Sequence, residues 1–180
     1  MEVVRNIYIE NSAVRINDAV DFIQDEKAFK PFAKKVYRHY DMDYPKFYKM
    51  SPLSKLGFLA SELLLKDVDL SGIDREKVSI IMANSSSSLH TDAIYQESIE
   101  SKPSPAIFVY TLPSILIGEI CIRNGFKGEG IFFIREHFDK GFIFECAENL
   151  LRSTQTDMSL VGWVEMDMEG SYLADLYLVK

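Results

Sequence analysis

Two short, mostly apolar runs constrain the fold of this chain more than any other feature. Val78 to Ala83 reads VSIIMA, and Gly130 to Ile134 reads GIFFI. The first run is continuous and β-branched, which is typical of a strand buried on both faces, as in a parallel sheet. The second is another short apolar strand. Parallel strands need long crossover connections, usually helices, so we expect helices on the faces of this sheet.

Helical patterns do separate these runs. Ser51 to Leu65 reads SPLSKLGFLASELLL, with a capping serine, a proline suited to the first turn and leucines at helical spacing. A polar helix is expected from about Thr91 to Glu100. A second apolar helix, in LPSILIGEICIRNGFKG, should end at Gly125. Between Lys140 and Ser153 the apolar residues again share one helical face.

The two ends of the chain complete the predicted sheet. IYIENSAVRI alternates as a strand or hairpin does, whereas Asp18–Tyr40 reads as a charged, aromatic stretch that is partly helical and broken at Pro31. MSLVGWVEM and YLADLYLV are predicted strands joined by a turn at Glu169-Gly170. The order predicts an α/β fold with a five-stranded mixed sheet, in a single domain covering residues 1–180.

Composition excludes several classes of function. The chain has 180 residues, 47% of them hydrophobic, and its net charge of -7 comes from interspersed acidic and basic residues. Nucleic acids and anionic membranes need clustered Lys and Arg, so we expect neither as a partner. No apolar run has the length of a membrane span, and the N-terminus lacks a signal-peptide pattern. Cys121 and Cys146, the only cysteines, lie in helical apolar patterns, which favours a reducing cytoplasm over a disulfide framework.

Several local motifs occur in an order that one enzyme family shares. They are a helix MSPLSKLGFLASELLL, a strand and small-residue loop VSIIMANSSSS, the segment SPAIFVYTLPSILIGEICIRNGFKGEG with its Ser-Pro, Thr-Leu-Pro and Gly-x-x-Gly elements, and the strand DMSLVGWVEM. Between Lys49 and Met166 this order resembles the N-terminal half of the β-ketoacyl-acyl-carrier-protein synthases, which have the thiolase fold. The resemblance implies a layered, thiolase-like half-domain.

Departures from the family pattern shape the expected function. The family's nucleophilic cysteine opens the helix after the GIFFI-like strand, and here that position falls at or within a residue of His137. Cys146 lies about two and a half turns further along, and Cys121 belongs to the preceding helix. The family's catalytic histidines lie in a C-terminal half that would begin where this chain stops, at Lys180. The resemblance therefore implies a truncated ketosynthase homologue without a nucleophile, which does not condense acyl chains.

Two polar segments remain candidates for chemistry. His137, with Glu136 beside it, could act as a general base at a helix start, but a charged turn in which Asp139 caps the helix is preferred, because no Ser or Cys adjoins this histidine in sequence. Ser85 to Ser88 could bind a phosphate or a pantetheine arm, yet this stretch lacks the Gly and Lys residues of a phosphate-binding loop. It is interpreted as a turn.

Neither a metal site nor a cofactor site is expected. The three histidines show no metal-ligand spacing, and no cofactor motif is present. The aromatic residues around GIFFI fit a core better than an apolar-ligand site, which is kept as a third interpretation. They are Phe132, Phe133, Phe138 and Phe142.

The segment from Ile131 through Phe132 and Phe133 to Ile134 is the candidate interface. In the resembled fold this strand pairs with its copy in a second subunit, and an apolar edge strand needs a partner to cover it. A buried central strand is the alternative. We expect a homodimer or a heterodimer with a ketosynthase, acting in fatty-acid, polyene or polyketide assembly, with an acyl carrier protein as a further candidate partner. A different acyl-transfer or thioester-hydrolysis reaction through His137 is the runner-up.

Overall fold

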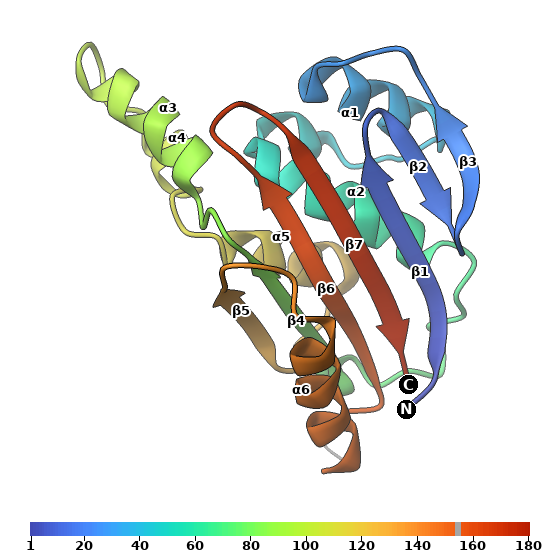
Figure 1. Ribbon diagram of the computed structural model, residues 1–180. Helices are drawn as coiled ribbons and strands as arrows, with labels where there is room; N and C mark the ends of the chain where they lie inside the picture. The colour runs from blue at the N-terminus through green and yellow to red at the C-terminus, as the bar shows by residue number, and fades with distance from the viewer. Residues whose placement is uncertain (154–155) are drawn as a thin grey trace.

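Seven strands form one mixed sheet in the computed structural model of the protein, which describes residues 1–153 and 156–180 (Figure 1). The strands are β1 (Val3–Glu10), β2 (Ala13–Ile16), β3 (Ala19–Ile23), β4 (Val78–Asn84), β5 (Gly130–Ile134), β6 (Met158–Met166) and β7 (Tyr172–Val179). The helices are α1 (Phe29–His39), α2 (Pro52–Leu65), α3 (Leu89–Ile99), α4 (Pro105–Phe108), α5 (Ile115–Asn124) and α6 (Lys140–Arg152), with 3-10 turns η1 (Pro45–Lys49) and η2 (Arg75–Lys77).

The strands lie in the order β3-β2-β1-β7-β6-β4-β5. β4 pairs in parallel with β5 on one side and with β6 on the other, whereas β7 runs antiparallel to both β6 and β1. The α/β class and the mixed sheet predicted from the sequence are confirmed. β4 is buried along its whole length, Ser79 and Asn84 included, as its mostly apolar, β-branched sequence indicates.

The prediction of five strands is wrong, because the N-terminal region supplies three strands and not one. IYIENSAVRI divides between β1 and β2, and β3 lies inside the segment that was expected to be partly helical. Asn11-Ser12 and Asn17-Asp18 make the two connections with positive φ at both residues. Such pairs of left-handed residues are the geometry of tight hairpin turns, which Asn and Asp tolerate. Pro31 does not break α1, since it lies in the first turn, where no helical N–H is required.

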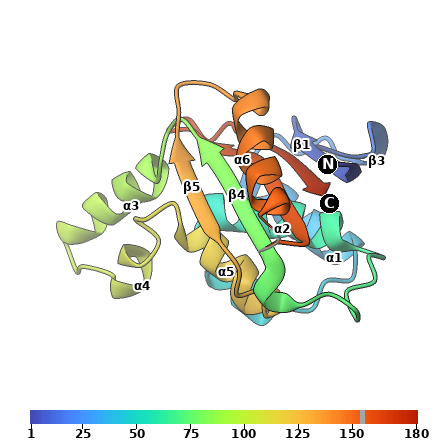
Figure 2. The ribbon, with the colours of Figure 1, turned by 90° about the horizontal axis from the view of Figure 1, so that it is seen from below.

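Helices cover the two faces of the sheet unequally. α1, α2 and α5 pack on one face over the larger apolar core, and α6 lies on the other face against β4 and β6 (Figures 1 and 2). Close packing requires glycine, which has no side chain, at two positions. A Cβ at Gly57 in α2 would lie 2.2 Å from Leu116 of α5, and one at Gly162 in β6 would lie 2.1 Å from the carbonyl oxygen of Asp175. Gly162 also has a φ of 148°, which favours glycine.

α3 and α4 extend away from the sheet beyond the end of β4 (Figures 1 and 2). In the part of the chain that the structure describes, no helix has the length and apolar character that a membrane crossing requires. The protruding pair and the neighbouring strand ends therefore place the polar loops of interest at one corner of the molecule.

Candidate functional site

The loops that follow β4 and β5 begin side by side at the carboxyl ends of these strands. The backbone N–H of Arg135 donates to the carbonyl oxygen of Asn84 at 2.9 Å, one residue beyond the last strand pair. Ser85 to Ser88 therefore start next to the turn that contains Arg135 to Asp139. The carboxyl ends of parallel strands are where α/β proteins commonly place ligand and catalytic groups.

The serine loop is held by a carboxylate of the chain itself. Glu165 of β6 accepts hydrogen bonds from Ser85 N at 2.7 Å, from Ser85 Oγ at 2.6 Å and from Ser86 N at 3.3 Å. Asn84 bonds both the N–H and the carbonyl of Ser87. Because Glu165 occupies the donors that a phosphate would use, the geometry favours a structural loop. Sequence reasoning missed Glu165, since it lies 80 residues along the chain from Ser85.

The turn before α6 is a helix cap. Asp139 Oδ1 accepts from the N–H of Phe142 at 3.0 Å, which is the pattern of an N-cap residue. The Arg135 guanidinium lies 4.3 Å from the ring centre of Phe142 and 3.5 Å from Asp139 Oδ2. Glu136 and His137 are exposed at the surface between these residues. His137, the candidate base, therefore lies in a solvent-exposed turn and does not line any of the described cavities.

Neither cysteine occupies the start of a helix. Cys146 is the seventh residue of α6, and Cys121 lies in the seventh position of α5. Burial raises the pKa of both thiols, and Glu145 adds to the increase at Cys146. A raised pKa keeps a thiol protonated near neutral pH, so neither side chain is primed as a nucleophile. Among the described residues no cluster of His, Cys, Asp and Glu has the arrangement of a metal site.

The candidate interface strand β5 lies at the edge of the sheet. Its side chains divide between the two faces: Phe132 packs against the larger core, whereas Ile131 and Phe133 pack against the smaller core around α6. The ring of Phe133 meets that of Phe142 edge-on at 5.0 Å. Ile134 is 52% exposed. The four residues are brought together as one strand, and the alternative of a central strand is wrong for the described chain.

A second apolar surface lies near this edge. The α3–α4 arm, residues 89–112, exposes large apolar side chains at Leu89, Ile94, Ile99, Phe108, Val109 and Leu112. The arm is anchored to the serine loop, because Ser88 Oγ donates to the carbonyl oxygen of Thr111 at 2.8 Å. Exposed apolar groups gathered on one projection are a feature of surfaces that contact another protein.

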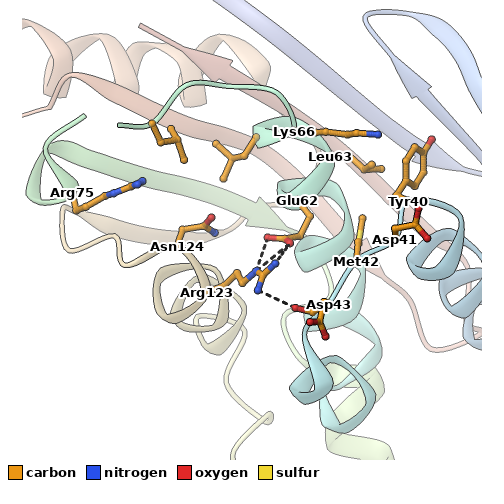
Figure 3. Close-up of a pocket in the computed structure, with 12 residues that line it drawn as sticks. Tyr40, Asp41, Met42, Asp43, Glu62, Leu63, Lys66, Arg75, Arg123 and Asn124 are labelled. Carbon is orange, nitrogen blue, oxygen red and sulfur yellow. Dashed lines mark hydrogen bonds and ion pairs between the residues drawn. The ribbon is translucent and has the colours of Figure 1, made fainter. Parts of the chain in front are cut away.

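A cavity of about 570 Å³, the largest of the five described, lies elsewhere, between the C-terminal ends of α2 and α5 and the loop after α1 (Figure 3). Figure 3 shows the Arg123 guanidinium directed at Glu62, with which it forms an ion pair at 3.0 Å, and it also bonds the Asp43 carbonyl at 3.1 Å. This pair joins α5 to α2 and occupies the middle of the cavity wall. The cavity is thus a solvent-filled groove between helices.

Comparison with known proteins gives a clear result only at the level of structure. No family model and no curated protein matches the sequence. The structure of the ishigamide ketosynthase/chain length factor superimposes with a TM-score of 0.67 at 14% identity, over 98% of this chain and 60% of that chain. A ketosynthase in complex with its chain length factor from Xenorhabdus doucetiae gives a TM-score of 0.63 at 12% identity, over 98% and 77%.

A third structure, a type II PKS acyl-carrier protein in complex with its ketosynthase bound to the hexaketide, gives a TM-score of 0.61 at 16% identity, over 99% of this chain and 61% of that chain. At these identities the comparisons establish a ketosynthase-like fold. The chain spans about 60% of the length of the first of these proteins.

Proposed function

We propose that this chain is a non-catalytic partner of a ketosynthase in acyl-chain assembly of the polyketide or polyene type. The observation that carries the proposal is the open, apolar edge of β5 on a ketosynthase-like fold. Two of the structurally similar proteins are ketosynthase and chain length factor assemblies, and one is a ketosynthase with an acyl-carrier protein. Support for a non-catalytic role comes from the turn before α6, where Asp139 caps the helix and no thiol adjoins it.

The hydrogen-bonding direction of β5 suits pairing with another strand. The N–H of Arg135 donates to Asn84, and the carbonyl of Glu129 accepts from Ile80. Odd-numbered residues therefore direct their backbone groups toward β4, and even-numbered residues direct theirs away from the sheet. Strand addition to such an edge uses these main-chain groups for affinity and the side chains for specificity.

The α3–α4 arm would extend the same contact. Its exposed Phe108, Val109 and Leu112 lie on the projection that follows β4, on the side of the sheet where β5 forms the edge (Figure 2). An apolar centre of this kind, next to a strand edge, can supply the buried area that a stable heterodimer needs. A ketosynthase is the proposed occupant, and a second copy of this chain is the competing outcome.

A proline substitution tests the strand pairing directly. Ile134→Pro removes an N–H that points away from β4, so the fold of the chain should survive. Ile134→Thr is the matched control, because it shortens the side chain but keeps the amide and a β-branched residue. Each tagged protein would be expressed in the host, and captured proteins would be identified by mass spectrometry.

The expected result is that the parent chain and Ile134→Thr capture a ketosynthase and that Ile134→Pro does not. Light scattering on the purified complexes should give the mass of one chain plus one ketosynthase. A monomeric parent that captures neither a ketosynthase nor an acyl carrier protein would refute the proposal. A homodimer that Ile134→Pro dissociates would replace the ketosynthase with a second copy of the chain.

No observation favours the alternative function, acyl transfer or thioester hydrolysis through His137, over the partner proposal. His137 and Glu136 are exposed, and Arg135 and Asp139 beside them are engaged with each other and with α6.

A further inference from the structure

A second cavity, separate from the β5 edge, combines an apolar wall with several cationic groups. It has a volume of about 490 Å³ and lies between the starts of α1 and α2, the body of α3 and the β6–β7 turn. Phe29, Pro52, Ile94 and Met166 supply apolar surface. This volume is within the range of small-molecule sites, which are mostly apolar with a few polar groups that fix orientation.

The charges around this cavity oppose those of the whole protein. Lys27, Lys30 and Lys55 line it against the single carboxylate of Glu169, whereas the chain as a whole has a net charge of -7. The three lysines come from two segments, so no single stretch of sequence displays the group. A local excess of cations beside an apolar wall is complementary to an anion that carries an apolar tail.

Lys55 is the deepest of these cations. Its Nζ donates to the carbonyl oxygen of Met50 at 2.5 Å, and it lies 5.9 Å from the centre of the buried Phe47 ring. Burial, followed by the charges of Lys30 and Lys34, lowers the pKa of Lys55 to about 8. Among residues 1–153 and 156–180 no carboxylate forms an ion pair with Lys55, so an anion beside its ammonium group would relieve this cost.

His90 also lines this cavity, and it carries an unmet hydrogen bond. Its Nδ1 is buried without a hydrogen-bond partner among residues 1–153 and 156–180. Buried polar atoms are usually paired, so the side chain has a polar capacity that the described residues do not use. Phe29 and Met166, which line the same cavity, are largely buried and supply its apolar surface.

We infer that this cavity binds an amphipathic carboxylate, such as a medium-chain fatty acid, with the carboxylate at Lys30 and Lys55 and the alkyl chain along Phe29, Ile94 and Met166. The inference does not depend on the proposed partner function, because the cavity is lined by α1, α2 and α3 and not by β5. Both parts of the ligand are required. The cations hold the head group, and the apolar wall excludes water from it.

Calorimetric titration with octanoate tests this inference, with octanol and acetate as ligands that each lack one part. Octanoate should bind with one-to-one stoichiometry, and both partial ligands should bind at least about tenfold more weakly. Lys30→Gln and Lys55→Gln should each weaken octanoate binding about tenfold, since a charge-assisted hydrogen bond is lost. Lys55→Gln retains a donor for Met50, and Lys30 is exposed, so both variants should fold.

Ile94→Ser should weaken octanoate binding by shortening the apolar wall, and Lys127→Gln should leave it unchanged, because Lys127 is exposed and does not line this cavity. Octanoate binding that both lysine variants leave intact would overturn the inference, as would octanol binding as tight as that of octanoate. The absence of any octanoate binding would also overturn it. The partner test with Ile134→Pro has an independent readout, so either proposal can fail alone.

Discussion

Replacing Lys55 with methionine should stabilise the free protein at neutral pH. The ammonium group is part-buried in the first turns of α2, and its environment lowers the pKa from 10.5 to about 8, chiefly by desolvation and secondarily through Lys30 and Lys34. A lysine whose pKa is lowered in the folded state is held at a cost while it is protonated. Methionine has a similar unbranched shape without the charge and adapts to irregular apolar surroundings.

The size of this effect follows from the pKa. At about 1.36 kcal/mol per pKa unit, a decrease from 10.5 to about 8 corresponds to roughly 3.4 kcal/mol. Because the side chain is part-exposed, solvent screening reduces the value to about 1–2 kcal/mol. Loss of the hydrogen bond to Met50 removes up to about 1 kcal/mol of the gain. We expect Lys55→Met to raise the free energy of unfolding by about 1 kcal/mol at pH 7.

The pH dependence gives a sharper signature. Between pH 8 and 10.5 the unfolded chain keeps the Lys55 proton that the folded chain has lost, so rising pH favours folding. The difference in stability between Lys55→Met and the parent should therefore shrink from pH 7 to pH 9.5. The pKa values of Cys121 and Cys146 are raised in the folded chain, so at the upper end of this range these thiols ionise more readily in the unfolded chain and lower the stability of the fold. This effect is the same in Lys55→Met and in the parent.

Urea denaturation at pH 7 and pH 9.5 measures both quantities, with Lys127→Met as the control for losing an exposed lysine. A Lys55→Met protein that is less stable than the parent at pH 7, or whose advantage is the same at both pH values, would refute the reasoning. Stabilisation together with lost octanoate binding would mean that the buried charge is retained for the ligand and not for the fold.

Two further predictions concern packing and catalysis. Gly57→Ala should destabilise the protein by about 1–3 kcal/mol, because the added methyl group would overlap the buried side chain of Leu116. Gly118→Ala on α5 is the control: its methyl group meets open space, so this variant should be as stable as the parent or slightly more stable. Equal melting temperatures for the two variants would contradict the prediction. The parent protein should not hydrolyse acyl thioesters above the buffer rate, and hydrolysis that His137→Ala abolishes would favour the enzymatic alternative over a non-catalytic partner.

The central elements were predictable because their patterns are long and local. α2, α5, α6, β4, β6 and β7 lie close to the segments predicted from apolar periodicity and from Gly125 as a helix end. β3 was not predictable in the same way. It is a five-residue strand with only Phe22 buried, so its pattern carries almost no signal of a buried face. The Asn17-Asp18 turn leads into this strand, and its one buried side chain, Phe22, packs against Phe32 of α1, a contact that the local pattern does not display.

The candidate site was predictable only where its parts are neighbours in sequence. The position of the turn before α6 follows from the strand and helix that flank it, and the capping role of Asp139 follows from its place. The bond between Glu165 and the serine loop joins segments 80 residues apart. The lysine-lined cavity combines three helices and a turn, so its charge excess is visible only after folding.

The two ends of the sheet differ in a way that limits how many molecules can join. At β3 the ladder is irregular between Val14 and Arg15, and Asp21 places a charge in the outermost strand. Such irregularities and charges hinder the addition of another strand. At β5 the outermost strand is short, regular and uncharged. Once a partner strand has docked on β5, the free sheet edge of this chain is β3, which resists pairing. Strand addition therefore stops at a pair of molecules and does not continue into a fibre.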